Sequence, residues 1–92
     1  MRVTVRVSGQ MRALLGAASL EISLPEGASV LDAVQQLAEG KHANVRATLL
    51  TDDGDIQRTL VVAVGSDQVT DATTQLLRDG DTVTILHPIS GG

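Results

Sequence analysis

A capped amphipathic helix near the middle of the chain restricts the possible folds more than any other feature of this sequence. Ser29 is a good N-cap, and Asp32 stands at the N3 position, where a negative charge favours the helix N-terminus. The apolar residues that follow at helical spacing form one stripe: Val30, Leu31, Val34, Leu37 and Ala38. Gly40 suits the position just after the last turn. Because a helix of about ten residues is marginal alone in water, we expect residues 29–39 to dock on a sheet.

Four segments have the patterns of β-strands. Residues 3–7 and 20–24 alternate apolar and polar side chains, which is the period of a strand with one buried face. Residues 60–64 are continuously apolar, so this strand is either covered on both faces or leaves one face for a partner. Residues 82–86 alternate again. Two strands before the helix and two after it predict an α+β fold in which one face of the sheet is covered.

The segments between these elements have weaker signals. Residues 11–16 fit a turn or a short helix, and residues 43–50 fit a second short helix. Residues 65–68, with the sequence Gly-Ser-Asp-Gln, are typical of a turn. Residues 52–55, Asp-Asp-Gly-Asp, also fit a turn, because they lack the alternating acidic positions and the distal Glu of a calcium loop.

The composition excludes several classes of function. The 92 residues contain no Cys and no aromatic side chain, and the formal net charge is -4. Without Cys there can be no disulfide, thiolate zinc site, iron–sulfur cluster or Cys nucleophile. An acidic chain without aromatic stacking platforms is poorly suited to bind nucleic acid or anionic lipid. His42 and His87 stand in no ligand or catalytic spacing, so we expect no metal site and no enzyme acting alone.

The sequence also lacks a pattern that would target it to a membrane. No segment reaches the roughly 18 consecutive apolar residues of a transmembrane helix. The first residues alternate Arg with Val, where a signal peptide would need an unbroken apolar run. We therefore expect a cytoplasmic protein.

The last six residues, 87–92, contain the candidate functional group. Pro88 has no N–H to donate to a sheet, so it stiffens the exit from the last strand. Gly91 and Gly92 have no Cβ, and a thin diglycine end can carry its α-carboxylate through a narrow channel to the reactive centre of another protein. A diglycine alone fits an incidental loose end equally well. We expect residues 1–86 to form one domain and residues 87–92 to form an exposed tail.

Residues 79–86, which run into residues 88–92 (Pro-Ile-Ser-Gly-Gly), resemble the MoaD/ThiS family of ubiquitin-like sulfur carriers. The order of strands and helix extends the resemblance over essentially the whole chain, and the length is similar to that of the MoaD and CysO branches. The resemblance implies a β-grasp fold, in which a mixed sheet packs on one main helix, here residues 29–39.

The same resemblance implies a mechanism that uses two partner proteins. An adenylyltransferase similar to ubiquitin-activating enzymes would join the carboxylate of Gly92 to AMP, using ATP and magnesium that it binds itself. A sulfur donor would then displace AMP and leave a thiocarboxylate, whose sulfur passes to an accepting synthase subunit. Gly92 would be the modified residue, and Pro88, Ile89, Ser90 and Gly91 would form the approach segment. The chain itself would bind no cofactor and hold no catalytic residue.

One face of the predicted sheet is the candidate partner interface. By strand parity, Thr84 and Leu86 point away from the helix, and we expect Val62 of the preceding strand on the same face. The tail leaves the sheet beside this face, so an enzyme that activates the tail would contact it.

The resemblance leaves the acceptor and the reaction open. Small subunits of molybdopterin synthase commonly carry aromatic residues near the tail, which this chain lacks. Delivery of sulfur towards cysteine is therefore a close competitor to molybdopterin synthesis. A ubiquitin-like modifier would use the same adenylate but form an isopeptide bond with a lysine. A plain β-grasp interaction module would leave the glycines without a role.

Overall fold

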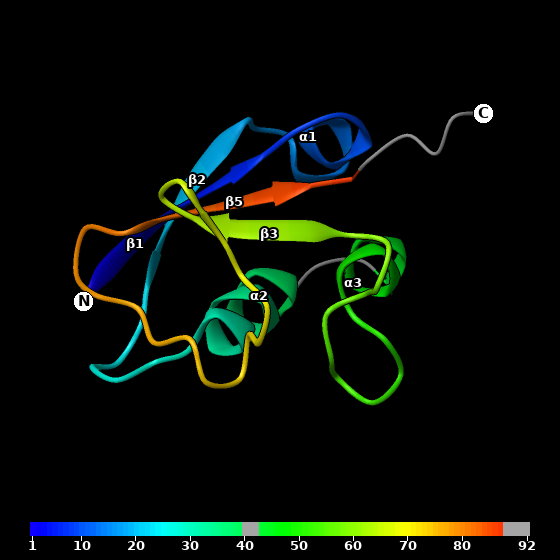
Figure 1. The fold of residues 1–92 in the computed structure, drawn as a ribbon. Coiled ribbons are helices and arrows are strands. Elements are labelled where there is room, and N and C mark those ends of the chain that lie inside the picture. The colour runs from blue at the N-terminus through cyan, green and yellow to red at the C-terminus, as the bar shows by residue number, and fades with distance from the viewer. Residues whose placement is uncertain (40–42, 88–92) are drawn as a thin grey trace.

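The computed structural model describes residues 1–39 and 43–87, which form a five-stranded sheet and three helices (Figure 1). The helices are α1 (Gln10–Leu15), α2 (Val30–Ala38) and α3 (Ala43–Leu49). The strands are β1 (Arg2–Val7), β2 (Ser19–Ser23), β3 (Val61–Val64), β4 (Asp67–Gln68) and β5 (Thr82–Leu86). Of the helices in the described part of the chain, none is long and apolar enough to cross a membrane.

The sheet is mixed, and the neighbouring strands β1 and β5 come from opposite ends of the sequence. The strand order is β2-β1-β5-β3-β4. β1 and β5 pair in parallel, whereas β2 on β1, β3 on β5 and β4 on β3 are antiparallel. Parallel neighbours need a long connection, and residues 8–81, which include all three helices, join β1 to β5. This arrangement confirms the predicted α+β fold.

Helix α2 begins where the sequence predicts. The backbone N–H of Asp32 donates to Ser29 Oγ at 3.1 Å, and the backbone N–H of Ser29 donates to Asp32 Oδ2 at 2.9 Å, which completes a capping box. The buried residues of the helix are Val30, Ala33, Val34, Leu37 and Ala38. Leu31, which we expected in the stripe, is only half-buried. Glu39 is the C-cap, and Gly40 lies outside the described residues.

The core lies between α2 and the inward face of the sheet. Val3 and Val5 of β1, and Val83 and Ile85 of β5, are each at most 1% exposed. Met11 brings α1 into the same cluster and is fully buried. Because burying an aliphatic side chain is worth about 1.5–3 kcal/mol, the two central strands provide a large part of the stability of the fold.

The two short segments with ambiguous signals are helices. Residues 11–15 fall on α1 and Gly16 is its C-cap, so of the two structures that the sequence allowed the segment forms the helix. Residues 43–50 correspond to α3, in which Val45 and Leu49 are buried. α1 and α3 lie near one another at the end of the sheet where β5 finishes (Figure 1).

The connection after β3 is shorter than we expected. Asp67 and Gln68 form β4, which pairs with β3, so the prediction of a turn over residues 65–68 is wrong for its second half. The turn consists of Gly65 and Ser66, and Gly65 has a φ of 59°. A two-residue turn that starts with a positive φ lets the chain pair with the preceding strand at once, and only Gly adopts this backbone easily.

Candidate functional site

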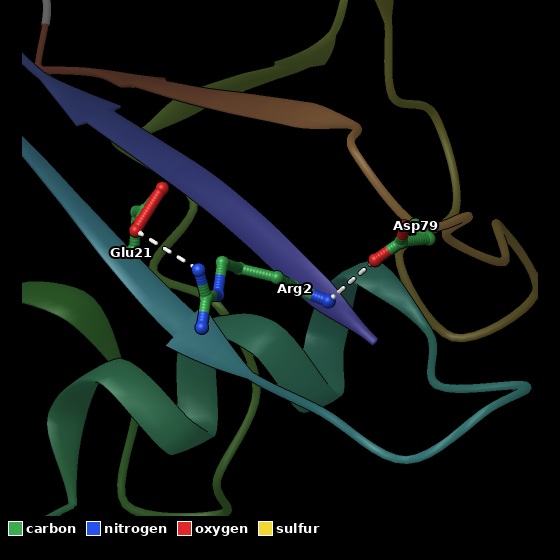
Figure 2. Close-up of polar contacts among 3 residues, drawn as sticks. All are labelled: Arg2, Glu21 and Asp79. Carbon is green, nitrogen blue, oxygen red and sulfur yellow. Dashed lines mark hydrogen bonds and ion pairs between the residues drawn. The ribbon is translucent and has the colours of Figure 1, made fainter.

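The start of β5 is fixed by the turn that precedes it. The backbone N–H of Arg2 donates to Asp79 Oδ1 at 2.8 Å (Figure 2). The backbone N–H of Gly80 donates to the carbonyl oxygen of Arg2 at 2.8 Å. Within the turn, Asp81 Oδ2 accepts a hydrogen bond from the backbone N–H of Arg78 at 2.8 Å. These bonds tie the turn to the first residues of β1, so β5 begins at a defined place.

The end of β5 is the point from which the predicted tail departs. β5 is hydrogen-bonded to β1 on one edge and to β3 on the other, and it finishes at Leu86. His87 follows and is half-buried. Residues 88–92 lie outside the described residues, and the tail positions predicted from the sequence fall there: Pro88, Ile89, Ser90, Gly91 and Gly92. The described structure therefore shows where the last strand ends, and the exposed tail stays a prediction.

The face of the sheet opposite α2 carries two of the three predicted interface residues. Thr84 lies between Arg6 of β1 and Ala63 of β3, and Leu86 lies opposite Val61. Directly paired residues share a face, and the alternate residues of β5 are buried in the core. Leu86 is 41% exposed. The prediction that Thr84 and Leu86 point away from the helix is confirmed.

The third predicted residue, Val62, does not belong to this face. It is 6% exposed and pairs with a fully buried residue of β5, so its side chain points into the core. Its neighbours Val61 and Ala63 are half-buried and lie on the open face. A continuously apolar strand carries no parity signal, so the sequence alone does not show which face of the sheet Val62 occupies. Pairing with Thr84, whose polar side chain marks the open face, is the signal that identifies Ala63.

We call Val61, Ala63, Thr84 and Leu86 the exit patch, because the strand that leads to the tail ends within it. Arg6 adjoins it through its pairing with Thr84 and brings a positive charge to its border. The exit patch is therefore a small, mainly apolar area with a cationic edge. Such an area suits a protein partner better than a small polar ligand.

Other charged groups of the sheet lie nearer its opposite edge. Arg2 Nη1 is 3.9 Å from Glu21 Oε2, and the two side chains are 70% and 63% exposed (Figure 2). An exposed pair at this distance is largely screened by water and adds little stability. In the segment between β4 and β5, the hydroxyl and backbone N–H of Thr73 donate to Asp71 and hold the pKa of that carboxyl below its ordinary value of 3.8.

Metal-ligand side chains do not gather anywhere in residues 1–39 and 43–87 in a group of three or more. The acidic segment 52–55 is a turn, as predicted. It is closed by a bond from the backbone N–H of Thr51 to the carbonyl oxygen of Asp55 at 2.7 Å. His42 lies outside the described residues.

A mixed sheet with its last strand in the centre, packed on one main helix, is the ubiquitin-like β-grasp architecture. The crystal structure of SAMP1 from Haloferax volcanii matches all of this chain and all of its own length, with a TM-score of 0.87 and 21% sequence identity. At this level of identity the likeness establishes the fold, and it confirms the predicted β-grasp.

Two further structures are more similar in sequence. CysO in the crystal structure of the Amycolatopsis orientalis BexX/CysO complex is 30% identical, with a TM-score of 0.74 over 98% of this chain and 99% of that chain. A molybdopterin converting factor subunit 1 from Pyrococcus furiosus, described as putative, is 27% identical, with a TM-score of 0.76 over 97% and 99%. A comparison with curated proteins gives no significant match.

The model of the ThiS family matches residues 5–92. The chain belongs to the ThiS family, and it is a ubiquitin-like protein of the MoaD/ThiS sulfur-carrier type, as the resemblance in the sequence implied.

Proposed function

We propose that this chain carries sulfur on the carboxyl group of Gly92, which a partner enzyme first activates as an adenylate. The observation that carries the proposal is the ThiS family match, which continues from β1 through Gly92 and so includes the diglycine. The absence of Cys from the sequence supports it, because no thiol is present to hold sulfur as a persulfide.

The proposed chemistry replaces one oxygen atom by sulfur in two steps. A carboxylate oxygen of Gly92 attacks the α-phosphorus of ATP, and pyrophosphate leaves. Hydrosulfide then attacks the carbonyl carbon, the C–O bond to AMP breaks, and AMP leaves with the electron pair. Adenylation is needed because a free carboxylate is a poor electrophile. ATP and magnesium bind the activating enzyme, and this chain contributes the acyl group.

The residues of the described structure would act by positioning. The turn at Asp79 fixes the start of β5, and the pairing of β5 on both edges fixes its end at Leu86. The exit patch would dock on the activating enzyme, so that a tail of only a few residues reaches a reactive centre at a set distance. A synthase subunit that accepts the sulfur would use the same face. The structure of CysO in a complex with BexX supports a protein partner for a chain of this kind.

The direct test is incubation of the protein with an activating enzyme of this family, ATP, magnesium and sulfide, followed by intact-mass measurement. We expect the mass to rise by the difference between sulfur and oxygen. The matched control lacks Gly92 and should gain nothing while its circular dichroism spectrum stays unchanged, because a terminal residue beyond the sheet contributes little packing. Failure of the full-length protein to form either the adenylate or the thiocarboxylate would contradict the proposal.

The same adenylate distinguishes a carrier from a protein modifier. If the acyl group passed to lysine amines, immunoblots of cell lysate would show a ladder of conjugates that disappears when Gly92 is deleted. For a sulfur carrier we expect the free protein alone.

A further inference from the structure

β2 is an edge strand, and half of its backbone groups face away from the sheet. Just beyond the strand, Leu24 exchanges hydrogen bonds with Met1 at 2.7 and 2.9 Å. Inward and outward backbone groups alternate along an antiparallel strand, so those of Ser19, Glu21 and Ser23 point outward. None of them bonds to another segment within the described residues. The edge therefore presents free donors and acceptors in a regular row.

A groove runs between this edge and helix α2. Its volume is 340 Å³, and its lining consists of Leu20, Glu21, Ile22, Ser23, Gln36, Leu37 and Glu39. Leu20 and Ile22 are the inward residues of β2, yet they are only half-buried, because no further strand covers them. We call this the β2–α2 groove. In this groove the apolar surface of Leu20 and Ile22 lies beside the free backbone groups of β2.

The charged side chains that line this region are acidic. Glu21 and Glu39 line the β2–α2 groove, and Asp32 lines the hollow that continues along α2. Among the described residues that line the two hollows, none is basic. Asp32 already serves the capping box, and the contact of Glu21 with Arg2 is exposed and 3.9 Å long. Glu21 and Glu39 therefore favour a positively charged ligand.

A second copy of this chain is poorly suited to the edge. Antiparallel pairing of two β2 strands about their centres would set Glu21 directly opposite the same residue of the other copy. Like charges in that position are destabilising. Each copy also has a net charge of -4, so the two would repel at long range.

We propose that the β2–α2 groove binds an extended basic segment of another protein, which adds a strand to β2. Backbone groups of the segment would pair with those of Ser19, Glu21 and Ser23, and alternate apolar side chains would cover Leu20 and Ile22. Lysine or arginine between the apolar positions would face Glu21. β1 separates this edge from β5, so the groove and the exit patch are distinct surfaces.

The test uses the ¹⁵N-labelled full chain and a short acetylated peptide in which lysine alternates with valine. On titration to about 1 mM peptide, we expect saturable amide shifts that centre on Ser19, Glu21 and Ser23 and extend to Leu37. A peptide in which glutamate replaces lysine is the matched ligand control, and it should bind at least tenfold more weakly.

Two variants separate backbone pairing from charge attraction. In Ser23→Pro the outward N–H is lost while Glu21 and the inward ladder to β1 are kept, so the fold should persist and affinity should fall by about five- to tenfold. Glu21→Lys removes the attraction without removing the N–H, and it should weaken binding to a similar degree. Asp67→Lys, an equal change of charge on the opposite edge strand, should leave affinity within about twofold.

Three outcomes would overturn the proposal. The first is the absence of shifts in β2 at the highest peptide concentration, with the spectrum of a folded protein. The second is equal binding of the glutamate peptide. The third is concentration-dependent dimerisation through β2 without peptide, which would make a second copy the occupant. Each is independent of sulfur transfer, because none involves Gly92 or the exit patch.

Discussion

β5 and β2 are strands of five residues with the same alternating pattern, yet their environments differ. Val83 and Ile85, the inward residues of β5, are fully buried because strands flank β5 on both edges and α2 covers its face. Leu20 and Ile22, the inward residues of β2, stay half-buried because only β1 flanks that strand. The position of a strand in the sheet, rather than its local sequence pattern, therefore decides whether its inward residues are fully buried or remain partly exposed.

This difference matters for both proposals. A tail that must reach a reactive centre needs a fixed origin, and the central strand supplies one. An edge strand with free backbone groups can accept a further strand without disturbing that origin.

The largest expected effect is a loss of stability, and it is measured by comparing the inward isoleucine of β5 with the inward isoleucine of β2. Ile85→Ala leaves a cavity in the closed core and should lower the free energy of unfolding by about 3–4 kcal/mol, whereas Ile22→Ala at the open edge should cost about 1–2 kcal/mol. Urea denaturation followed by far-UV circular dichroism measures both, since the chain has no aromatic fluorophore. Equal costs would contradict the distinction between centre and edge.

The exit patch is tested by an exposed leucine at the end of β5. Leu86→Asp should leave the free energy of unfolding nearly unchanged but lower the rate of adenylation by tenfold or more, roughly 1.4 kcal/mol in transition-state stabilisation, because a charge would enter an apolar contact. Leu76→Asp is the matched control, since Leu76 is 59% exposed and lies outside the sheet. A similar loss of rate in both variants would show that the patch has no special role.

The anchoring of β5 is tested at the turn before it. Asp79→Ala removes the acceptor of the Arg2 backbone N–H and should destabilise the fold by about 1 kcal/mol. Glu21→Ala removes only the exposed ion pair of β2 and should cost less than about 0.5 kcal/mol. Thermal unfolding of the two variants ranks them, and a larger loss for Glu21→Ala would reverse the assignment.

The smallest effect concerns Asp71, in the segment that leads to β5. Hydrogen bonds from Thr73 lower the folded-state pKa of this carboxyl below 3.8. Their stabilisation is therefore present above pH 3.8 and is lost as the pH falls through the lowered pKa. NMR titration of Thr73→Ala should find the pKa of Asp71 raised towards its ordinary value. An unchanged pKa would mean that the hydroxyl of Thr73 contributes nothing.

Much of this fold could be predicted because local chemistry specified it. Ser29 and Asp32 cap α2 as their spacing indicates, and the alternation in residues 82–86 gives the correct faces of β5. Predictions failed where the face or the extent of a strand depends on its pairing with another strand. The apolar run of residues 60–64 has no parity of its own, and the prediction that Val62 lies on the open face is wrong. β4 forms only because β3 is beside it, and two residues carry no pattern.

The candidate site divides in the same way. Thr84 and Leu86 follow from parity within one strand, whereas Arg6, Val61 and Ala63 join them only through pairing across the sheet. The β2–α2 groove has no sequence signature, because it arises from the place of β2 at an edge and from the distance at which α2 packs. The tail residues, Pro88 to Gly92, remain predictions from the sequence and from the family.

The central claim is that Gly92 carries the sulfur, and top-down fragmentation of the protein after reaction with activating enzyme, ATP and sulfide tests it most directly. We predict that the added mass is confined to fragments that contain the carboxyl group of Gly92 and is lost when the acceptor synthase is supplied. Sulfur located at any other residue, or a carboxyl-terminal fragment of unchanged mass under conditions in which the enzyme consumes ATP, would contradict the account.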